Sequence, residues 1–379
     1  MTRSDTGAGE VLAELRTLGP TTRRGLVDAL GWSRVTVGKR LDELLASGLV
    51  VSTGYGASEG GRPAETFALN HDYGLLLGLD IGGAFTRLAI TDLGGRFLAE
   101  DAADIGLATG PLGVAGWADE RAARLLAGLG KDVDDVRAVG VGVPGPVDMR
   151  AGVIGAPLRE AAWEGVAFTD LLAVRGQVQV VDRDVNLMAV AEHAAVGEGR
   201  HTVVVRVGMG MSCAFVLDGR VYRGERGGVG VLTLPGPDGR LRRLEEVASG
   251  YVIRDRLTAE GTRVSTSLEI VDLVQAGHPL ACTLVGEVGD ALGRALAEVV
   301  RLLNPSTVVI GGAMADAGGV LMAPLRAAIE AGAGSYALQT LRIRGSLLGG
   351  RAGTTGAVTL AADALLEPTR VTRLVESLA

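Results

Sequence analysis

Hydrophobic residues in the first seventy positions follow a helical spacing three times in succession. Each set recurs every three or four residues, which places it on one face of a helix. The three sets are Val11, Leu12, Leu15 and Leu18, then Leu26, Val27 and Leu30, and finally Val37, Leu41 and Leu44. Glycines end the first and third helices and form the turn between the second and third. Thr22 and Ser33 stand where side chains cap the second and third helices.

Two short strands follow, over residues 50–53 and 66–69, and the Gly-rich loop between them contains Arg62. This order of three helices and a two-stranded wing resembles a winged helix-turn-helix, whose third helix enters the major groove of DNA. The residues that we expect to contact DNA are polar or basic: Thr22, Arg23, Ser33, Arg34, Thr36, Lys39, Arg40 and Arg62. The alternative is a small protein-interaction domain with a charged, solvated face. We therefore expect a first domain over residues 1–70.

The remainder of the chain, residues 71–379, contains one pattern twice. Residues 75–99 and 202–223 each read as an apolar strand, a Gly-rich turn, a second strand and a hairpin in which Asp and Gly precede Arg. This self-similarity predicts two like lobes, over about residues 71–195 and 196–379, with a cleft between them. Ligands of such α/β sheets lie beyond the C-terminal ends of the strands, where these Gly-rich turns gather.

Between and after the repeats, the hydrophobic pattern alternates between helices and buried strands. Helices are expected over residues 117–130, 182–196, 284–303, 321–331 and 354–366, and buried strands over residues 137–143, 177–181 and 307–310. The fold class is therefore α/β.

Composition narrows the class of protein. The net charge is −7, and residues 1–70 contain eight Lys and Arg against eight Asp and Glu, so the rest of the chain has all of this charge. That balance argues against non-specific nucleic-acid binding over the whole surface. The two cysteines, Cys213 and Cys282, are far apart, and we expect both to be reduced thiols in a cytoplasmic protein. The sequence shows no signal peptide and no apolar run of about 18 residues, so no membrane association is expected.

Several motifs after residue 75 resemble those of the ROK family (repressors, open reading frames and kinases). The motifs are Asp-Ile-Gly-Gly ending at Gly83, Gly-Val-Gly-Val-Pro-Gly-Pro-Val-Asp ending at Asp148, and Asp-Arg-Asp-Val-Asn ending at Asn186. The resemblance implies an actin-like, ribonuclease H-like fold of two duplicated lobes. It also implies that the first motif lies near phosphate, the second binds sugar, and Asp184 occupies the position of the general base of the kinases. Asp184 also stands where a helix cap is expected.

The chain departs from the pattern of the kinases where their chemistry depends on particular side chains. Ala84 and Met209 stand where kinases have Thr in the two phosphate loops, and Arg183 replaces a sugar-contacting Asn. Gly228 and Val231 stand at the sugar-binding Glu and at the His of a Cys-rich zinc loop. Phosphoryl transfer depends on positioning and charge stabilisation, so the lost donors argue against catalysis. We expect no catalytic residues, no metal site and no cofactor.

The resemblance and its departures together predict a transcriptional regulator, by analogy a repressor, that senses a sugar-like effector. Since Arg183 adds a cation to the cleft, an acidic or phosphorylated compound is expected. The effector-binding residues would be Gly82, Gly83, Pro144, Gly145, Arg183, Asp184 and Gly228. The partners would be a palindromic double-stranded operator and further copies of the chain, as a homodimer or a dimer of dimers. Two alternatives are an ATP-dependent sugar kinase fused to a DNA-binding module, and a regulator whose pocket binds no ligand.

Overall fold

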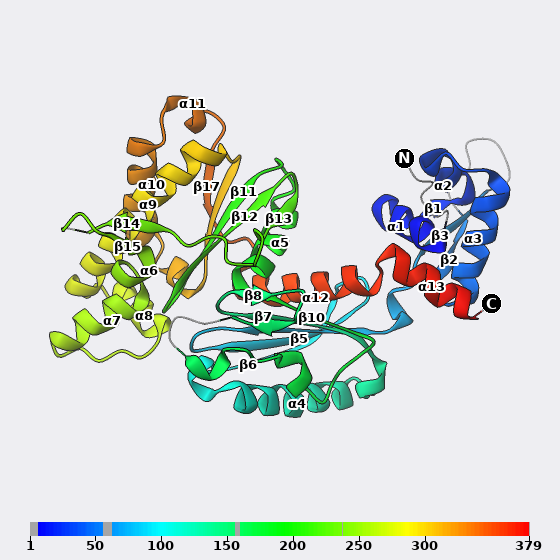
Figure 1. The fold of residues 1–379 in the computed structure, drawn as a ribbon, viewed down its shortest axis with the longest axis horizontal. Coiled ribbons are helices and arrows are strands. Elements are labelled where there is room, and N and C mark those ends of the chain that lie inside the picture. Colours follow the sequence, from blue (N-terminus) through cyan, green and yellow to red (C-terminus); the bar gives the residue numbers. More distant parts are fainter. Residues whose placement is uncertain (1–6, 56–62, 156–159, 237, 379) are drawn as a thin grey trace.

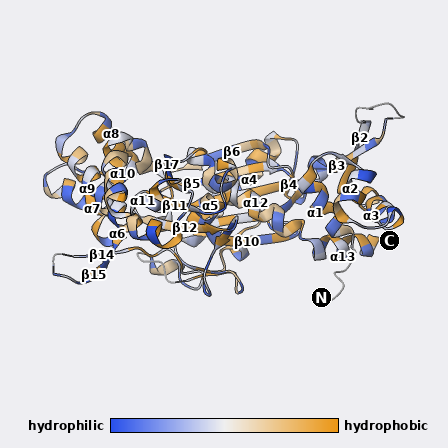
Figure 2. Ribbon diagram, turned by 90° about the horizontal axis from the view of Figure 1, so that it is seen from above, coloured by the Kyte–Doolittle hydropathy of each residue, from blue (hydrophilic) through white to orange (hydrophobic). Residues whose placement is uncertain are grey.

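The computed structural model describes residues 7–55, 63–155, 160–236 and 238–378. It consists of an N-terminal module and two larger lobes, and Figure 1 shows the module beside one end of the first lobe. Viewed from above, the module and the helices α7 to α10 of the second lobe lie at opposite ends of an elongated molecule (Figure 2).

The N-terminal module contains three helices and a small antiparallel sheet. The helices are α1 (Ala8–Leu18), α2 (Arg23–Leu30) and α3 (Arg34–Ala46). The sheet has the order β1-β3-β2, from β1 (Thr21–Thr22), β2 (Val50–Tyr55) and β3 (Glu65–Leu69). Both predicted caps are confirmed, because the Thr22 hydroxyl accepts from the N–H of Gly25 at 3.1 Å and the Ser33 hydroxyl accepts from that of Thr36 at 3.1 Å. The strand β1 was not predicted.

The hydrophobic faces of the three helices meet in one core. Leu26, Val37 and Leu41 are fully buried there with Phe67 of β3. The prediction for Leu18 was wrong, since 46% of this residue is exposed. Leu18 is the last residue of α1, so its side chain lies past the end of the packed face.

A C-terminal helix that the sequence analysis missed completes this core. In α13 (Pro368–Leu378), Val371 and Val375 are buried in the same hydrophobic cluster as α1. Figure 1 shows this red helix against the blue α1. The approach is close, because a Cβ atom on Gly9 would lie 1.9 Å from the carbonyl oxygen of Pro368. Segments from the two ends of the described chain therefore fold together.

The first lobe has a five-stranded sheet in the order β10-β7-β4-β5-β6. Its strands are β4 (Leu75–Ile81), β5 (Thr86–Asp92), β6 (Phe97–Ala103), β7 (Val136–Val143) and β10 (Val178–Arg183). β4, β5 and β6 are antiparallel neighbours, whereas β7 and β10 are added in parallel. The helix α4 (Pro111–Gly128) packs on this sheet and buries Ala122 and Leu126.

The second lobe repeats this topology. Its sheet has the order β13-β12-β11-β16-β17, with three antiparallel strands followed by two parallel ones. The strands are β11 (Thr202–Val207), β12 (Met211–Leu217), β13 (Arg220–Tyr222), β16 (Thr307–Gly311) and β17 (Arg342–Gly345). The helices α9 (Pro279–Leu303) and α10 (Gly319–Gly332) pack against each other and contribute to this lobe's core. The predicted duplication is thus seen strand for strand.

Two long helices cross between the lobes. α5 (Asp184–Val196) follows the last strand of the first sheet but packs on β11 and β12 of the second. α12 (Ala352–Leu365) follows the second sheet but packs on β4 and β7 of the first, and α5 and α12 contact each other. The expected division near residue 195 therefore differs from the packing, since α5 covers the other lobe's sheet.

The remaining α-helices and strands are short or peripheral. They are β8 (Val147–Asp148), β9 (Val153–Ile154), β14 (Thr233–Pro235), β15 (Leu241–Arg243), α6 (Leu244–Val247), α7 (Gly250–Ala259), α8 (Ser267–Gln275) and α11 (Ser335–Leu338). Within the described ranges no single helix has the length and apolar character to cross a bilayer, and only α8 and α9 taken together, across a bend of 116°, pass that test.

Candidate functional site

A cavity of about 590 Å³ lies between the two lobes, beside the C-terminal ends of the central strands. Its lining includes all seven residues that the sequence analysis assigned to an effector: Gly82, Gly83, Pro144, Gly145, Arg183, Asp184 and Gly228. It also includes residues that were not predicted, among them Arg87, Arg206 and Arg243. The repeated Gly-rich turns thus meet in one place, as the topology requires.

The first turn requires glycine because its backbone folds tightly back on itself. The N–H of Gly82 donates to the carbonyl oxygen of Phe85 at 2.8 Å, and a Cβ atom on Gly82 would lie 2.6 Å from that oxygen. In the second turn the N–H of Gly208 donates to the carbonyl oxygen of Gly210 at 2.9 Å. The glycines therefore let the backbone of both turns fold tightly beside the cavity.

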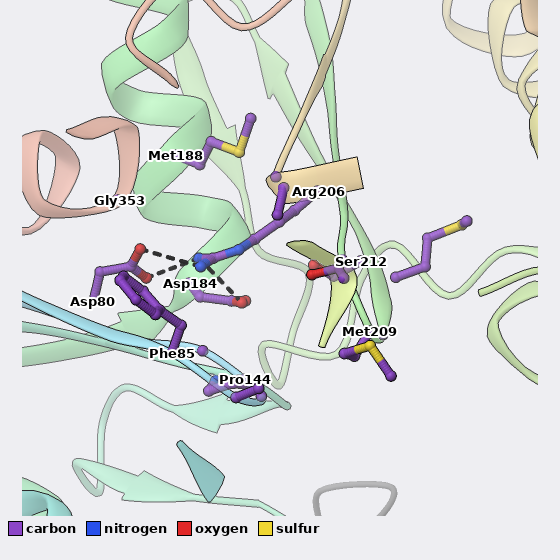
Figure 3. Close-up of a pocket in the computed structure, with 18 of the residues that line it drawn as sticks. Asp80, Phe85, Pro144, Asp184, Met188, Arg206, Met209, Ser212 and Gly353 are labelled. Atoms are coloured by element: carbon purple, nitrogen blue, oxygen red, sulfur yellow. Dashed lines mark hydrogen bonds and ion pairs between the residues drawn. The ribbon is translucent and has the colours of Figure 1, made fainter. Parts of the chain in front are cut away.

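A buried ion cluster occupies the centre of the cleft. Arg206 of β11 reaches across from the second lobe, with Nη1 2.8 Å from Oδ1 of Asp80 and 3.3 Å from Oδ2 of Asp184. Its Nη2 also donates to Oδ2 of Asp80 at 3.2 Å. Figure 3 shows the guanidinium between the two carboxylates. The side chains of Asp80 and Asp184 are only 6% and 8% exposed, and that of Arg206 is 23% exposed.

This environment changes the acidity of the groups. Burial raises the pKa of Asp184, and the neighbouring Asp80 raises it further, while the positive charge of Arg206 opposes both effects. For Arg206, burial lowers the pKa, but the two carboxylates outweigh burial and raise it above the usual value, so the guanidinium stays charged. Arg206 is thus the guanidinium that contacts both carboxylates of the cluster.

Arg206 was missed by the sequence analysis, although the sequence contained a signal. It is the one charged residue in the apolar strand Thr202–Val207. A charged residue inside a buried strand needs a partner, because an unpaired buried charge is costly. The sequence did not reveal which residues the partners are, since Asp80 lies in the other lobe.

Asp80 also lies against the start of α12. A Cβ atom on Gly353 would lie 2.1 Å from Oδ2 of Asp80, so only glycine fits there. The carboxylate thus lies at a helix N-terminus, where negative charge is favoured. Because Asp80 and Asp184 already share one guanidinium, this centre does not fit a divalent cation, and we derive no metal-dependent step from it.

Arg183 lies at the N-cap of α5 and lines the cavity, but its guanidinium is already engaged. It donates to the carbonyl oxygen of Val229 in the loop before β14. Its neighbour Asp182 pairs with Arg223 at 2.8 Å and accepts from Asn186 at 2.8 Å. The Asp-Arg-Asp sequence thus places only Asp184 in the central cluster.

The second Gly-rich turn presents apolar bulk instead of donors. Met209 is buried in the core of the second lobe, and burial also raises the pKa of the nearby Cys213 thiol to about 12. The loop over residues 224–232 packs closely, since a Cβ atom on Gly230 would lie 2.0 Å from the carbonyl oxygen of Cys213. Neither of the chain's two cysteines lies in this loop, so its donors do not fit a thiolate zinc site.

The predicted DNA-contacting residues divide into engaged and exposed groups. Arg23 donates to Oδ1 of Asp42 at 2.6 Å and lies over the ring of Phe67, so it holds α2 against α3. Arg40 pairs with Glu43 at 3.0 Å. The Ser33 and Thr36 hydroxyls lie 2.8 Å apart, and the Thr22 hydroxyl caps α2.

The exposed group comprises Arg34 and Lys39, on the outward face of α3. Figure 1 places α3 on the side of the module away from the two lobes. The Lys39 side chain is 71% exposed and lies 3.9 Å from the partly buried Glu43, a long ion pair that costs little to exchange for another partner. Arg62, predicted to lie on the wing, falls outside the described residues.

Comparison with known proteins identifies the architecture. The model of the ROK family matches residues 76–364. A xylose repressor of Caldicellulosiruptor bescii is 25% identical, over 88% of this chain and 90% of its own length. A glucokinase of Thermotoga maritima is 28% identical, over 66% of this chain and 86% of its own length.

Solved structures give the same result for the fold. The crystal structure of a ROK family transcriptional regulator, a homologue of the Escherichia coli MLC protein, aligns with a TM-score of 0.77 at 24% identity and covers 97% of this chain and 98% of that one. A ROK family glucokinase from Streptomyces griseus, in complex with glucose and AMPPNP, aligns with a TM-score of 0.62 at 24% identity, over 76% of this chain and 99% of that one.

Proposed function

Because the chain belongs to the ROK family, we propose that it is a DNA-binding transcriptional repressor that senses a sugar-like effector and does not phosphorylate it. The observation that carries this proposal is the position of Arg206, between the two carboxylates of the cleft. A resident guanidinium there satisfies charges that a catalytic site would leave available for a metal ion or a reacting group.

The N-terminal module supports the DNA-binding part of the proposal. We infer that it is a winged helix-turn-helix with α3 as the recognition helix and the β2–β3 hairpin as the wing. Arg34 and Lys39 would contact base edges or phosphates, and the residues that the module itself engages would position α3. The solved ROK family transcriptional regulator aligns with 97% of this chain, so the alignment includes most of this module as well as the lobes. One module contacts one half-site, so we propose a homodimer, or a dimer of dimers, on a palindromic operator.

The cleft supports the sensing part. Arg87, Arg183, Arg206 and Arg243 line the cavity together with the carboxylates of Asp80, Asp104, Asp184, Glu245 and Asp316. Since Arg183 and Arg206 are engaged by Val229 and by the central carboxylates, we propose that Arg87 and Arg243 bind an acidic or phosphorylated sugar-like compound in preference to a neutral hexose. The two lobes would close differently with and without this ligand. α12 begins against Asp80 in the cleft and ends near α13, which packs on α1. A ligand that favours one closure would thereby change the position of the N-terminal module.

Two measurements test the proposal. The purified protein is expected to enrich a palindromic sequence from a random duplex library, and failure to enrich any sequence would refute DNA-specific regulation. In a thermal-shift panel, gluconate and glucose 6-phosphate are expected to raise the melting temperature more than glucose and xylose do. Stabilisation by the neutral sugars alone would refute the acidic effector.

A sugar kinase is the second candidate, favoured by Asp184 at the cleft and by the 28% identity to a glucokinase. A coupled assay with ATP, Mg²⁺ and common hexoses separates the two. We expect no turnover above that of an Asp184→Asn variant. Turnover that this substitution abolishes would establish a kinase.

A further inference from the structure

Val35 is the most exposed large apolar residue of the described N-terminal module, with 82% of its surface accessible. It is the second residue of α3 and lies between Arg34 and Thr36. We propose that Val35 contacts the C5-methyl group of a thymine in the major groove and so helps to select the DNA sequence. This inference rests on the proposed DNA-binding function and adds the chemistry by which one base pair is chosen.

The helix geometry gives Val35 access to a groove. Gly38 and Lys39 lie three and four residues further along α3, so all three share one face. A Cβ atom on Gly38 would meet only Nη1 of Arg23, at 3.7 Å. The surface is therefore shallow beside Val35, and the helix can approach base edges closely there. Recognition helices place their N-terminal residues against the bases, which is where Val35 stands.

The neighbouring polar side chains are less free to read bases. The hydroxyls of Ser33 and Thr36 lie 2.8 Å apart, and the Arg40 guanidinium pairs with Glu43. The exposed residues at the start of α3 are Ser33, Arg34 and Val35, and Lys39 is exposed one turn further on.

The two cations on this face suit phosphate or guanine, whereas a valine side chain has no hydrogen-bonding group. The thymine methyl is the apolar group that the major groove offers. Burying one methyl against Val35 corresponds to about a fourfold change in affinity.

The test uses the full-length protein and the sequence that it enriches from a random duplex library. Each thymine of that sequence is replaced in turn by deoxyuridine, which removes the methyl and keeps the base pair. We expect one thymine in each half-site at which this change weakens wild-type binding about fourfold. In Val35→Ala, affinity for the unmodified site falls by a similar factor, and the effect of deoxyuridine at that thymine disappears. Leu18→Ala, an exposed apolar residue on α1, is the matched control and is expected to behave as wild type.

The outcomes separate this inference from the proposed function. If no sequence is enriched, the proposed function fails and the Val35 contact falls with it. If a sequence is enriched but Val35→Ala retains the sensitivity of every thymine to deoxyuridine, DNA-specific binding stands and the Val35 contact is refuted. If Val35→Ala leaves DNA affinity unchanged and alters the oligomeric state, Val35 belongs to an interface between copies, and the inference is likewise overturned.

Discussion

Replacing Arg206 by methionine removes the positive charge of the cleft and retains a side chain of similar reach. The carboxylates of Asp80 and Asp184, 6% and 8% exposed, then face each other without compensation. Removing one partner of a buried pair typically costs about 3–5 kcal/mol. The protein can limit this cost by binding a proton on one carboxylate, and burial already favours that by raising the pKa of Asp184.

The proton makes the cost depend on pH in a calculable way. Protonating an aspartate costs about 1.4 kcal/mol for every pH unit above its usual pKa of about 3.9. This amounts to about 5 kcal/mol at pH 7.5 and about 2 kcal/mol at pH 5.5. Since the folded variant holds a proton that the unfolded chain does not hold between pH 5.5 and 7.5, its stability relative to wild type falls as pH rises.

The assay is urea denaturation of wild type and Arg206→Met at several pH values between 5.5 and 7.5. Arg206→Met combined with Asp184→Asn is expected to recover most of the loss at pH 7.5, because the second change removes the uncompensated charge. Arg342→Met is the control, since its pair with Glu198 is 69% and 68% exposed and contributes little. A deficit for Arg206→Met that does not change with pH, or the absence of a deficit, would refute the role of Arg206 as the cation that compensates the two carboxylates.

Three further predictions concern buried groups. Burial raises the pKa of the Cys213 thiol to about 12, so the folded protein keeps a proton that the unfolded chain loses near pH 9. Between pH 8 and pH 10, wild type should therefore lose about 1.4 kcal/mol more stability than Cys213→Ala, measured by urea denaturation. Equal losses in the two proteins would contradict this. Gly9→Ala should push α13 away from α1, because the added Cβ meets the Pro368 carbonyl; faster hydrogen exchange in α13 measures this, and unchanged protection would be contrary evidence. Gly353→Ala should destabilise the protein by about 1–3 kcal/mol in the same denaturation assay, since its Cβ meets a buried carboxylate. Gly116→Ala in α4 serves as the control for both glycines. It should be neutral or stabilising, because there is open space around its Cβ.

The local features of the fold were predictable from the sequence because each depends on neighbours in the chain. Thr22 and Ser33 cap their helices as expected, since a cap needs only the next three residues. The duplicated strand pattern also predicted two like sheets, because each repeat specifies its own hairpin.

The features that failed depend on contacts between distant segments. The ion cluster of Arg206 joins two lobes, and no local rule pairs residues that are so far apart in sequence. The helix α13 was readable in part, because Val371 and Val375 have helical spacing after Pro368. Its place against α1 was not readable, since that follows from the path of α12 along the first sheet. The exchange of α5 and α12 between the lobes has the same origin.

The packing of α13 on α1 has a consequence for biosynthesis. Domains generally fold as they leave the ribosome, starting from the N-terminal side. The first helices of this chain emerge early, but the cluster that buries Leu12 and Leu15 also contains Val371 and Val375. Part of the apolar surface of the nascent module therefore stays exposed to solvent until both lobes and α13 have been translated. A truncated translation product would keep α1, α2 and α3 but lack α13, which packs against α1.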